Sequence, residues 1–350
     1  MDLLLIALIA ISALCGCSSS FPGGEEDASL SLKIGVGDHV ALYRSSGSSE
    51  WEQAVDGQGV YCAAAFLFDG SSLVAHSQVQ LQQLQSGAEL KFSNDVPYGS
   101  YTLYIVANWG AYGDYEGMQG FAAAMEQVKL SGKMTEDFAG YLISSQGGVC
   151  KTVPHPLQCV MQVNLVPGAN RVEALLERSV ARIRIAVENN SNEILEVQSL
   201  SFSNRFTQQD AWLFGNRGYR NDRRCGITVG NQNAVVPFIG SYVQPVKLEA
   251  MGNTTVFDAY ILESSMQQGE SGYSYALKLA YETSEGYTEK TAQIALQTVD
   301  ATTGQPEDVE EIRRNDFIDV VVRVTYSRNT GSIQFEVVPW YSGGGNVDFS

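Results

Sequence analysis

The 350-residue chain has few basic side chains and almost no histidine. Its 22 lysine and arginine residues stand against 39 aspartate and glutamate residues, which gives a net charge of -17 at pH 7. Because no basic face is available to neutralise phosphates, this composition excludes nucleic acid as a partner. The three histidines form no HExxH or HxH pattern, and no GxSxG motif is present. The sequence therefore predicts neither an enzyme nor a protein with a metal site or a cofactor.

Long apolar runs are also scarce, apart from one at the start of the chain. Residues 3–14 read LLLIALIAISAL, a run too short to span a bilayer but typical of the core of a secretory signal. The following residues, Leu14-Cys15-Gly16-Cys17, resemble the lipobox of a bacterial lipoprotein. By that resemblance, removal of the signal makes Cys17 the N-terminus of the mature protein, and its thiol carries lipid such as palmitate. An ordinary signal with incidental cysteines is the alternative.

The start of the chain sets the expected domain organisation. Residues 1–17 form the signal, and residues 18–29 form an acidic, flexible tether. No later window reaches 18 apolar residues, so the remainder is expected outside the cytoplasm. The length suggests about two domains, which we place at residues 30–177 and 178–350.

Helical patterns are rare, and period-two alternation of apolar and polar residues dominates. Leu30, Leu32, Ile34 and Val36 alternate with polar or small residues. Two short helices are expected in the first half, at residues 121–130 and 135–143 (TEDFAGYLI), with Thr135 placed to cap the second. The pattern predicts an all-β fold made of β-sandwiches. Further strands are expected at residues 59–69, 100–108, 159–166, 180–189, 194–203, 254–263, 273–282, 290–298, 317–326 and 332–338.

Four cysteines remain outside the signal segment. Cys150 and Cys159 flank a short segment that contains two prolines, and a disulfide between them would close a small loop. Cys62 and Cys225 are expected to be buried thiols, and a disulfide between them is the alternative.

Several segments, taken together, resemble the Bacteroidales fimbrillins, which are pilins derived from lipoproteins. They are Phe66-Leu67-Phe68-Asp69-Gly70, the stretch VPYGSYTLYIVAN at residues 96–108, LERSVARIRI at 176–185, and Arg314-Asn315-Asp316-Phe317 followed by Val337-Val338-Pro339-Trp340. The resemblance implies two tandem transthyretin-like β-sandwich domains, with the short helices inserted in the first. It also implies a lipid-anchored precursor at the outer membrane and a final location in a surface fimbria.

The same resemblance implies assembly by donor-strand exchange with other fimbrial subunits. A protease cuts after the first strand, and a segment of another subunit takes its place. Arg44 and Ser45 are the candidate cleavage site, because Arg44 follows the alternating strand and precedes a serine-rich loop. The alternative is that Arg44 is an ordinary surface residue at the end of a strand. The removable strand would carry Leu30, Leu32, Ile34 and Val36. The candidate donor segment contains Trp340, Val347 and Phe349 and could instead be a terminal hairpin strand of its own domain.

The expected function is a structural fimbrial subunit that supports adhesion, with a host or bacterial surface ligand as a further partner. The alternative is a monomeric surface lipoprotein that binds a glycan or a host protein. Its candidate site is the one basic group of the sequence, Arg217, Arg220, Arg223 and Arg224, although an ordinary charged loop explains that group as well.

Overall fold

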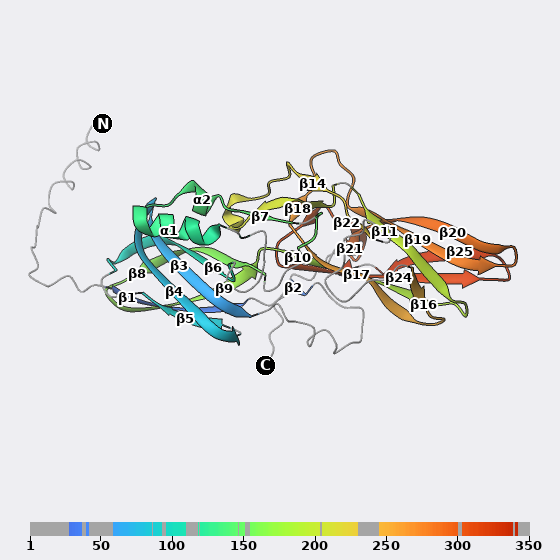
Figure 1. The fold of residues 1–350 in the computed structure, drawn as a ribbon, viewed down its shortest axis with the longest axis horizontal. Coiled ribbons are helices and arrows are strands. Elements are labelled where there is room, and N and C mark those ends of the chain that lie inside the picture. Colours follow the sequence, from blue (N-terminus) through green and yellow to red (C-terminus); the bar gives the residue numbers. More distant parts are fainter. Residues whose placement is uncertain are drawn as a thin grey trace, which may run out of the picture.

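The computed structural model shows an elongated molecule in which strands prevail, and the two α-helices among the described residues lie in one half (Figure 1). This confirms the predicted all-β class. No helix among the described residues is long and apolar enough to cross a membrane. The structure describes residues 28–36, 40–41, 59–85, 87–92, 96–109, 118, 120–145, 147–150, 155–203, 205–229, 245–299, 303–338 and 340–341.

The N-terminal half is built on a sheet of seven described strands in the order β4-β3-β6-β8-β9-β1-β5. Neighbours run antiparallel except β1 and β9, which are parallel. The strands are β1 (Ala28–Val36), β3 (Val60–Asp69), β4 (Ser72–Gln85), β5 (Gly87–Lys91), β6 (Gly99–Ala107), β8 (Leu157–Leu165) and β9 (Gly168–Arg178).

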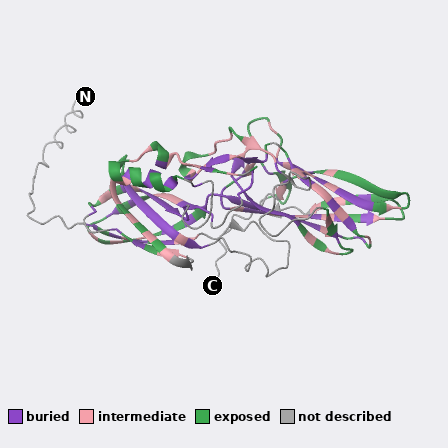
Figure 2. Cartoon of the chain, in the orientation of Figure 1, coloured by how far each residue is buried: buried purple, intermediate pink, exposed green. Residues whose placement is uncertain are grey.

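Strand β3 is buried along nearly its whole length because its two faces belong to two hydrophobic cores (Figure 2). Phe66 and Phe68 pack against helices α1 (Phe121–Ser131) and α2 (Glu136–Ala139). Ala65 and Leu67 point to the opposite face, into the core that also holds β1. Helix α1 matches the sequence prediction. Helix α2 begins as predicted, with the Thr135 hydroxyl accepting a hydrogen bond from the backbone N–H of Phe138 at 3.3 Å, but it ends at Ala139, and the last residues of the predicted helix enter strand β7 (Leu142–Ser144).

The C-terminal half contains two larger sheets that enclose one core. One has the order β17-β10-β24-β2, with β25 also paired to β24, and the other has the order β15-β11-β19-β20, with β16 paired to β11. Their strands are β2 (Val40–Ala41), β10 (Ala181–Asn189), β11 (Leu195–Phe202), β15 (Thr228–Val229), β16 (Val246–Leu248), β17 (Asn253–Ile261), β19 (Ser274–Thr283), β20 (Gly286–Ala295), β24 (Asp316–Ser327) and β25 (Ser332–Val338).

Short strands join the two halves and line their junction. In particular, β7 (Leu142–Ser144) of the first half pairs with β13 (Asp210–Trp212) of the second. The core beneath the helices likewise includes residues from both halves, so the halves pack closely. The other short elements are β12 (Thr207–Gln208), η3 (Gly215–Arg217), β14 (Arg224–Cys225), β18 (Ser264–Ser265), β21 (Gln297–Val299), β22 (Pro306–Asp308), β23 (Glu311–Ile312) and β26 (Trp340–Tyr341).

Candidate functional site

Strand β1 is the first described element of the chain, and one of its faces is entirely inside the core. The alternating pattern places Ala28, Leu30, Leu32 and Ile34 on that face, where each is at most 2% exposed. Val36 packs against the same core and is partly buried. The sequence prediction of a strand that fills a line of core positions is therefore confirmed for its geometry.

Backbone pairing holds β1 on both sides. It runs parallel to β9 and antiparallel to β5, and the carbonyl of Leu30 accepts from the N–H of Phe92 at 3.1 Å. At its start, Ala28 and Val96 exchange two backbone hydrogen bonds of 3.0 and 3.3 Å. Among the described strands, β5 pairs with β1 alone. Removal of β1 would leave unpaired backbone groups on β9 and β5, which are templates for a new strand.

The same N-terminal segment continues into the other half of the molecule. Val40 and Ala41 form β2, which pairs in parallel with β24 at Asp316 and Phe317. Residues 28–41 therefore contribute one strand to the sheet of the first half and one to a sheet of the second. No local pattern predicts this second pairing, because its partner strand lies far along the chain.

Buried ion pairs hold the strands next to the junction, and the first of them links β10 to β17. The guanidinium of Arg182 donates two hydrogen bonds, of 2.8 and 2.7 Å, to the carboxylate of Asp258. The same guanidinium lies 5.4 Å from the ring centre of Phe317 and 5.7 Å from that of Tyr260. Such bidentate, charge-assisted pairs fix geometry, and breaking one by removing a partner is costly.

A second buried pair lies beside the first. Arg314 donates from Nε to Glu263 at 2.9 Å and from its terminal nitrogens to the carbonyls of Leu213 at 2.9 Å and Trp212 at 3.0 Å. These carbonyls belong to the segment that carries β13, so Arg314 ties three separate segments together.

Residues next to Arg314 complete the junction. The guanidinium of Arg178 donates to the side chain of Asn315 at 2.9 Å, and the Asn315 backbone has a positive φ of 61°. Burial raises the pKa of Asp316 to about 6, while its carboxylate accepts a 2.7 Å hydrogen bond from the N–H of Arg313. The segments at 176–185 and 314–317, which suggested the fimbrillins, therefore meet at the junction and have a structural role there.

Several predicted site residues lie outside the described part of the chain. Cys17, Arg44, Ser45, Val347 and Phe349 belong to this group. Their proposed roles remain predictions.

Trp340 of the candidate donor segment is placed in β26. This strand pairs in parallel with β21, where Trp340 lies opposite Thr298. This pairing is within the same chain but is parallel, so it is not the terminal hairpin strand that the sequence offered as the alternative, and the donor role of the segment remains a prediction.

The predicted disulfide between Cys150 and Cys159 is contradicted, because the structure has no bond between these two sulfurs. Cys150 lies in the core under the helices, and its N–H donates to the carbonyl of Tyr260 at 2.8 Å. Cys159 lies on β8, opposite Ile105 of β6, and packs against the other core. The pairing of their strands turns the two thiols toward different cores.

The arginine group of the alternative function is neutralised by neighbouring carboxylates. Arg217 pairs with Glu136, Arg220 with Asp222, Arg223 with Asp210 and Arg224 with Glu270. These four pairs leave little positive charge for an anionic ligand. The observation speaks against a glycan site at this group.

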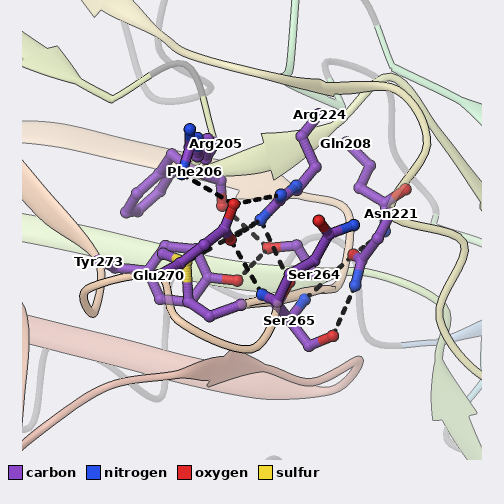
Figure 3. Close-up of polar contacts among 11 residues, drawn as sticks. Arg205, Phe206, Gln208, Asn221, Arg224, Ser264, Ser265, Glu270 and Tyr273 are labelled. Carbon is purple, nitrogen blue, oxygen red and sulfur yellow. Dashed lines mark hydrogen bonds and ion pairs between the residues drawn. The ribbon is translucent and has the colours of Figure 1, made fainter.

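Glu270 is the centre of the largest of these networks (Figure 3). Its carboxylate accepts hydrogen bonds from Arg224 at 2.6 and 2.9 Å and from Arg205 at 2.8 Å. The hydrogen bonds from Arg224 are the main reason that the pKa of Glu270 is lowered to about 2. The network attaches the loop that follows β18 to the two-stranded sheet of β12 and β14.

Comparisons with solved structures show the fold. A candidate cell adhesion protein from Parabacteroides distasonis has a TM-score of 0.53 at 14% identity, over 90% of this chain and 98% of that one. A candidate cell adhesion protein from Bacteroides eggerthii also has a TM-score of 0.53 at 14% identity, over 91% and 98% of the two chains. The tip fimbrial protein Mfa3 from Porphyromonas gingivalis has a TM-score of 0.47 at 14% identity, over 89% and 100%.

A search among curated proteins found no match. A family model described as fimbrillin-A associated anchor proteins Mfa1 and Mfa2 matches residues 45–220, which is half of the chain. The match begins directly after Arg44 and includes the helices and the junction segment at 176–185. The chain belongs to this family of fimbrial proteins.

Proposed function

We propose that this protein is a structural subunit of a surface fimbria that is exported as a lipoprotein, is assembled by donor-strand exchange and supports adhesion. The observation that carries the proposal is strand β1, which fills a core and separates two other strands although it is the first described element. A strand at this place can leave without breaking the chain that forms the rest of the sheet.

Processing would follow the order of the sequence. Lipid on Cys17 holds the precursor at the outer membrane, and a protease with arginine preference cuts between Arg44 and Ser45. The released piece then includes both β1 and β2. Its departure opens a groove between β9 and β5 and frees the edge of β24 at Asp316 and Phe317.

The groove favours a replacement strand energetically. Leu30, Leu32 and Ile34 are fully buried. Each such side chain contributes about 1.5–3 kcal/mol on burial, so three refilled positions give a gross gain of roughly 5–9 kcal/mol. Ordering of the incoming strand opposes this gain, while new backbone hydrogen bonds add to it. The balance supports a durable non-covalent polymer.

The partners are other fimbrial subunits, either copies of this chain or its relatives. We place the domains at residues 30–177 and 178–350, with the groove in the first. The segment with Trp340, Val347 and Phe349 is the candidate donor to a neighbour. Trp340 would have to leave β21 to serve in this way.

Proteolysis of the folded precursor tests the proposal. The full chain, with Cys17→Ala to prevent lipidation, is treated with an arginine-specific protease, and the products are analysed by N-terminal sequencing and electron microscopy. We expect a new terminus at Ser45, followed by polymers, and we expect the Arg44→Ala variant to stay monomeric. A cut chain that keeps residues 28–44 bound and never polymerises, even with partner subunits, would refute the proposal.

A further inference from the structure

We propose that side chains on the outer face of the groove, the face on which β1 carries Ser31, Lys33 and Gly35, select the strand that enters it. That strand carries a basic residue at the position of Lys33 and glycine or another small residue at the position of Gly35. The candidate donor segment of this chain has Asp348 between Val347 and Phe349 and no basic residue, so the strand comes from a different kind of subunit. The inference rests on the proposed strand exchange and adds the sequence class of the incoming partner.

The inner face alone cannot provide this selection. Its positions are filled by Ala28, Leu30, Leu32 and Ile34. Any strand with alternating aliphatic residues meets that requirement, and alternation is common in β-proteins. Discrimination between such strands must therefore come from the other face, where β9, β1 and β5 place their side chains in registered rows.

The row at Lys33 has a distinct charge pattern. Lys33 lies opposite Glu89 of β5 and opposite Glu173 of β9. Its Nζ is 3.5 Å from a carboxylate oxygen of Glu173. When β1 is absent, two carboxylates face each other across the groove. An incoming basic side chain pairs with Glu173 as Lys33 does and is attracted to Glu89, whereas an acidic one meets two like charges.

A neighbouring row strengthens this choice. Ser31 lies between Lys91 of β5 and Arg171 of β9, and its hydroxyl donates to Glu89 at 2.8 Å. The two cations here disfavour a basic side chain at this position, two residues before the one that requires it. A strand shifted so that its basic residue falls at the Ser31 position places that residue between Lys91 and Arg171 and leaves Glu89 and Glu173 without a cation, so the charges also favour one register.

The row at Gly35 restricts size. Gly35 lies between Gly87 of β5 and Leu175 of β9. A Cβ atom built on Gly35 would make ordinary contact, at 3.4 Å, with Cδ2 of Leu175, so an alanine fits at this position. Leu175 is 68% exposed and occupies the space above Gly35. A larger side chain at this position would have to displace it.

Peptide binding to the processed protein tests the inference. A synthetic peptide with the sequence of residues 28–36 is labelled, and its affinity is measured by fluorescence anisotropy on the protein after protease treatment and removal of the first strand. At low salt, we expect the Lys33→Glu peptide to bind roughly 5- to 30-fold more weakly, because favourable cross-strand pairs become repulsive. The difference should shrink in 0.5 M salt, where exposed charges are screened.

Matched variants separate selection at the Lys33 and Gly35 positions from a general effect of peptide charge or size on binding. The Ser29→Glu peptide also gains negative charge but lies opposite Ala169, so its affinity should remain within about threefold of the reference. Glu173→Lys in the protein should restore part of the binding of the Lys33→Glu peptide. Leu175→Ala should likewise restore binding of a Gly35→Val peptide.

The outcomes distinguish the two proposals. If the reference peptide does not bind at all, strand exchange at this groove is refuted, and the inference fails with it. If the reference peptide and the Lys33→Glu and Gly35→Val peptides bind equally, exchange stands and selection by the outer face is refuted.

Discussion

Leu32→Ala in β1 is the most direct test of the groove. Leu32 is 0% exposed and lies in the middle of the strand, between Leu30 and Ile34. Truncation of a buried leucine to alanine removes its transfer free energy and leaves a cavity, which together cost about 2–5 kcal/mol. We expect the free energy of unfolding of the full chain, measured by urea denaturation, to fall by this amount.

The same substitution should also act on release of the strand. After cleavage at Arg44, the retained strand is held only by non-covalent contacts. If the substitution lowers the free energy that holds the cut strand in place by about 2 kcal/mol, the strand should be released roughly 30-fold faster or more completely. Release is measured by the loss of a fluorescent label attached near the N-terminus of the cut protein.

Lys33→Ala is the matched control, because the Lys33 side chain is 75% exposed and lies on the other face of the same strand. We expect it to change the free energy of unfolding by no more than about 0.5 kcal/mol. If Leu32→Ala were as stable as Lys33→Ala, β1 would not be part of the core, and the energetic argument for the groove would be wrong.

Further predictions concern the junction and the C-terminal core. Arg314→Met leaves the carboxylate of Glu263 buried without its main partner, so the free energy of unfolding measured in urea should fall by about 3–5 kcal/mol. Tyr273→Phe removes the 2.7 Å hydrogen bond to the Ser264 hydroxyl and should cost about 0.5–1.5 kcal/mol in the same assay. Tyr275→Phe should be neutral or stabilising, because its buried hydroxyl has no hydrogen-bond partner among the described residues; a clear loss would contradict this. The raised pKa of Asp316, about 6, means that the folded protein binds this proton more tightly than the unfolded chain. Its contribution to stability is therefore present below about pH 4 and is lost as pH rises to about 6. Asp316→Asn, which keeps an acceptor for the N–H of Arg313, should remove that slope in urea titrations across this range.

Alternating segments were the most predictable part of the fold. The strands expected at residues 59–69 and 180–189 correspond to β3 and β10, and the helix expected at 121–130 corresponds to α1. Strand β9 was missed. Its inward residues Val172, Ala174 and Leu176 do alternate, but the exposed Leu175 interrupts the pattern in a stretch rich in residues that favour helices.

The candidate site was only partly predictable for a similar reason. The burial of Leu30, Leu32 and Ile34 follows from local alternation. The parallel neighbour β9 and the pairing of β2 with β24 depend on contacts between distant segments, which leave no local pattern. Cys150 and Cys159 are not bonded to each other in the structure, because closeness in sequence does not determine which core a thiol faces once β8 is paired with β6.

The continuous course of residues 28–41 through both sheets sets a minimum length for any full replacement. Because β1 and β2 lie in different sheets, a full replacement must be long enough to pair with β9 and also with β24. A shorter insert could restore β1 but would leave the edge of β24 open at Asp316 and Phe317. Subunits joined by a short segment would thus retain an adhesive edge, whereas a segment of full length would seal it and limit lateral aggregation of the fibre.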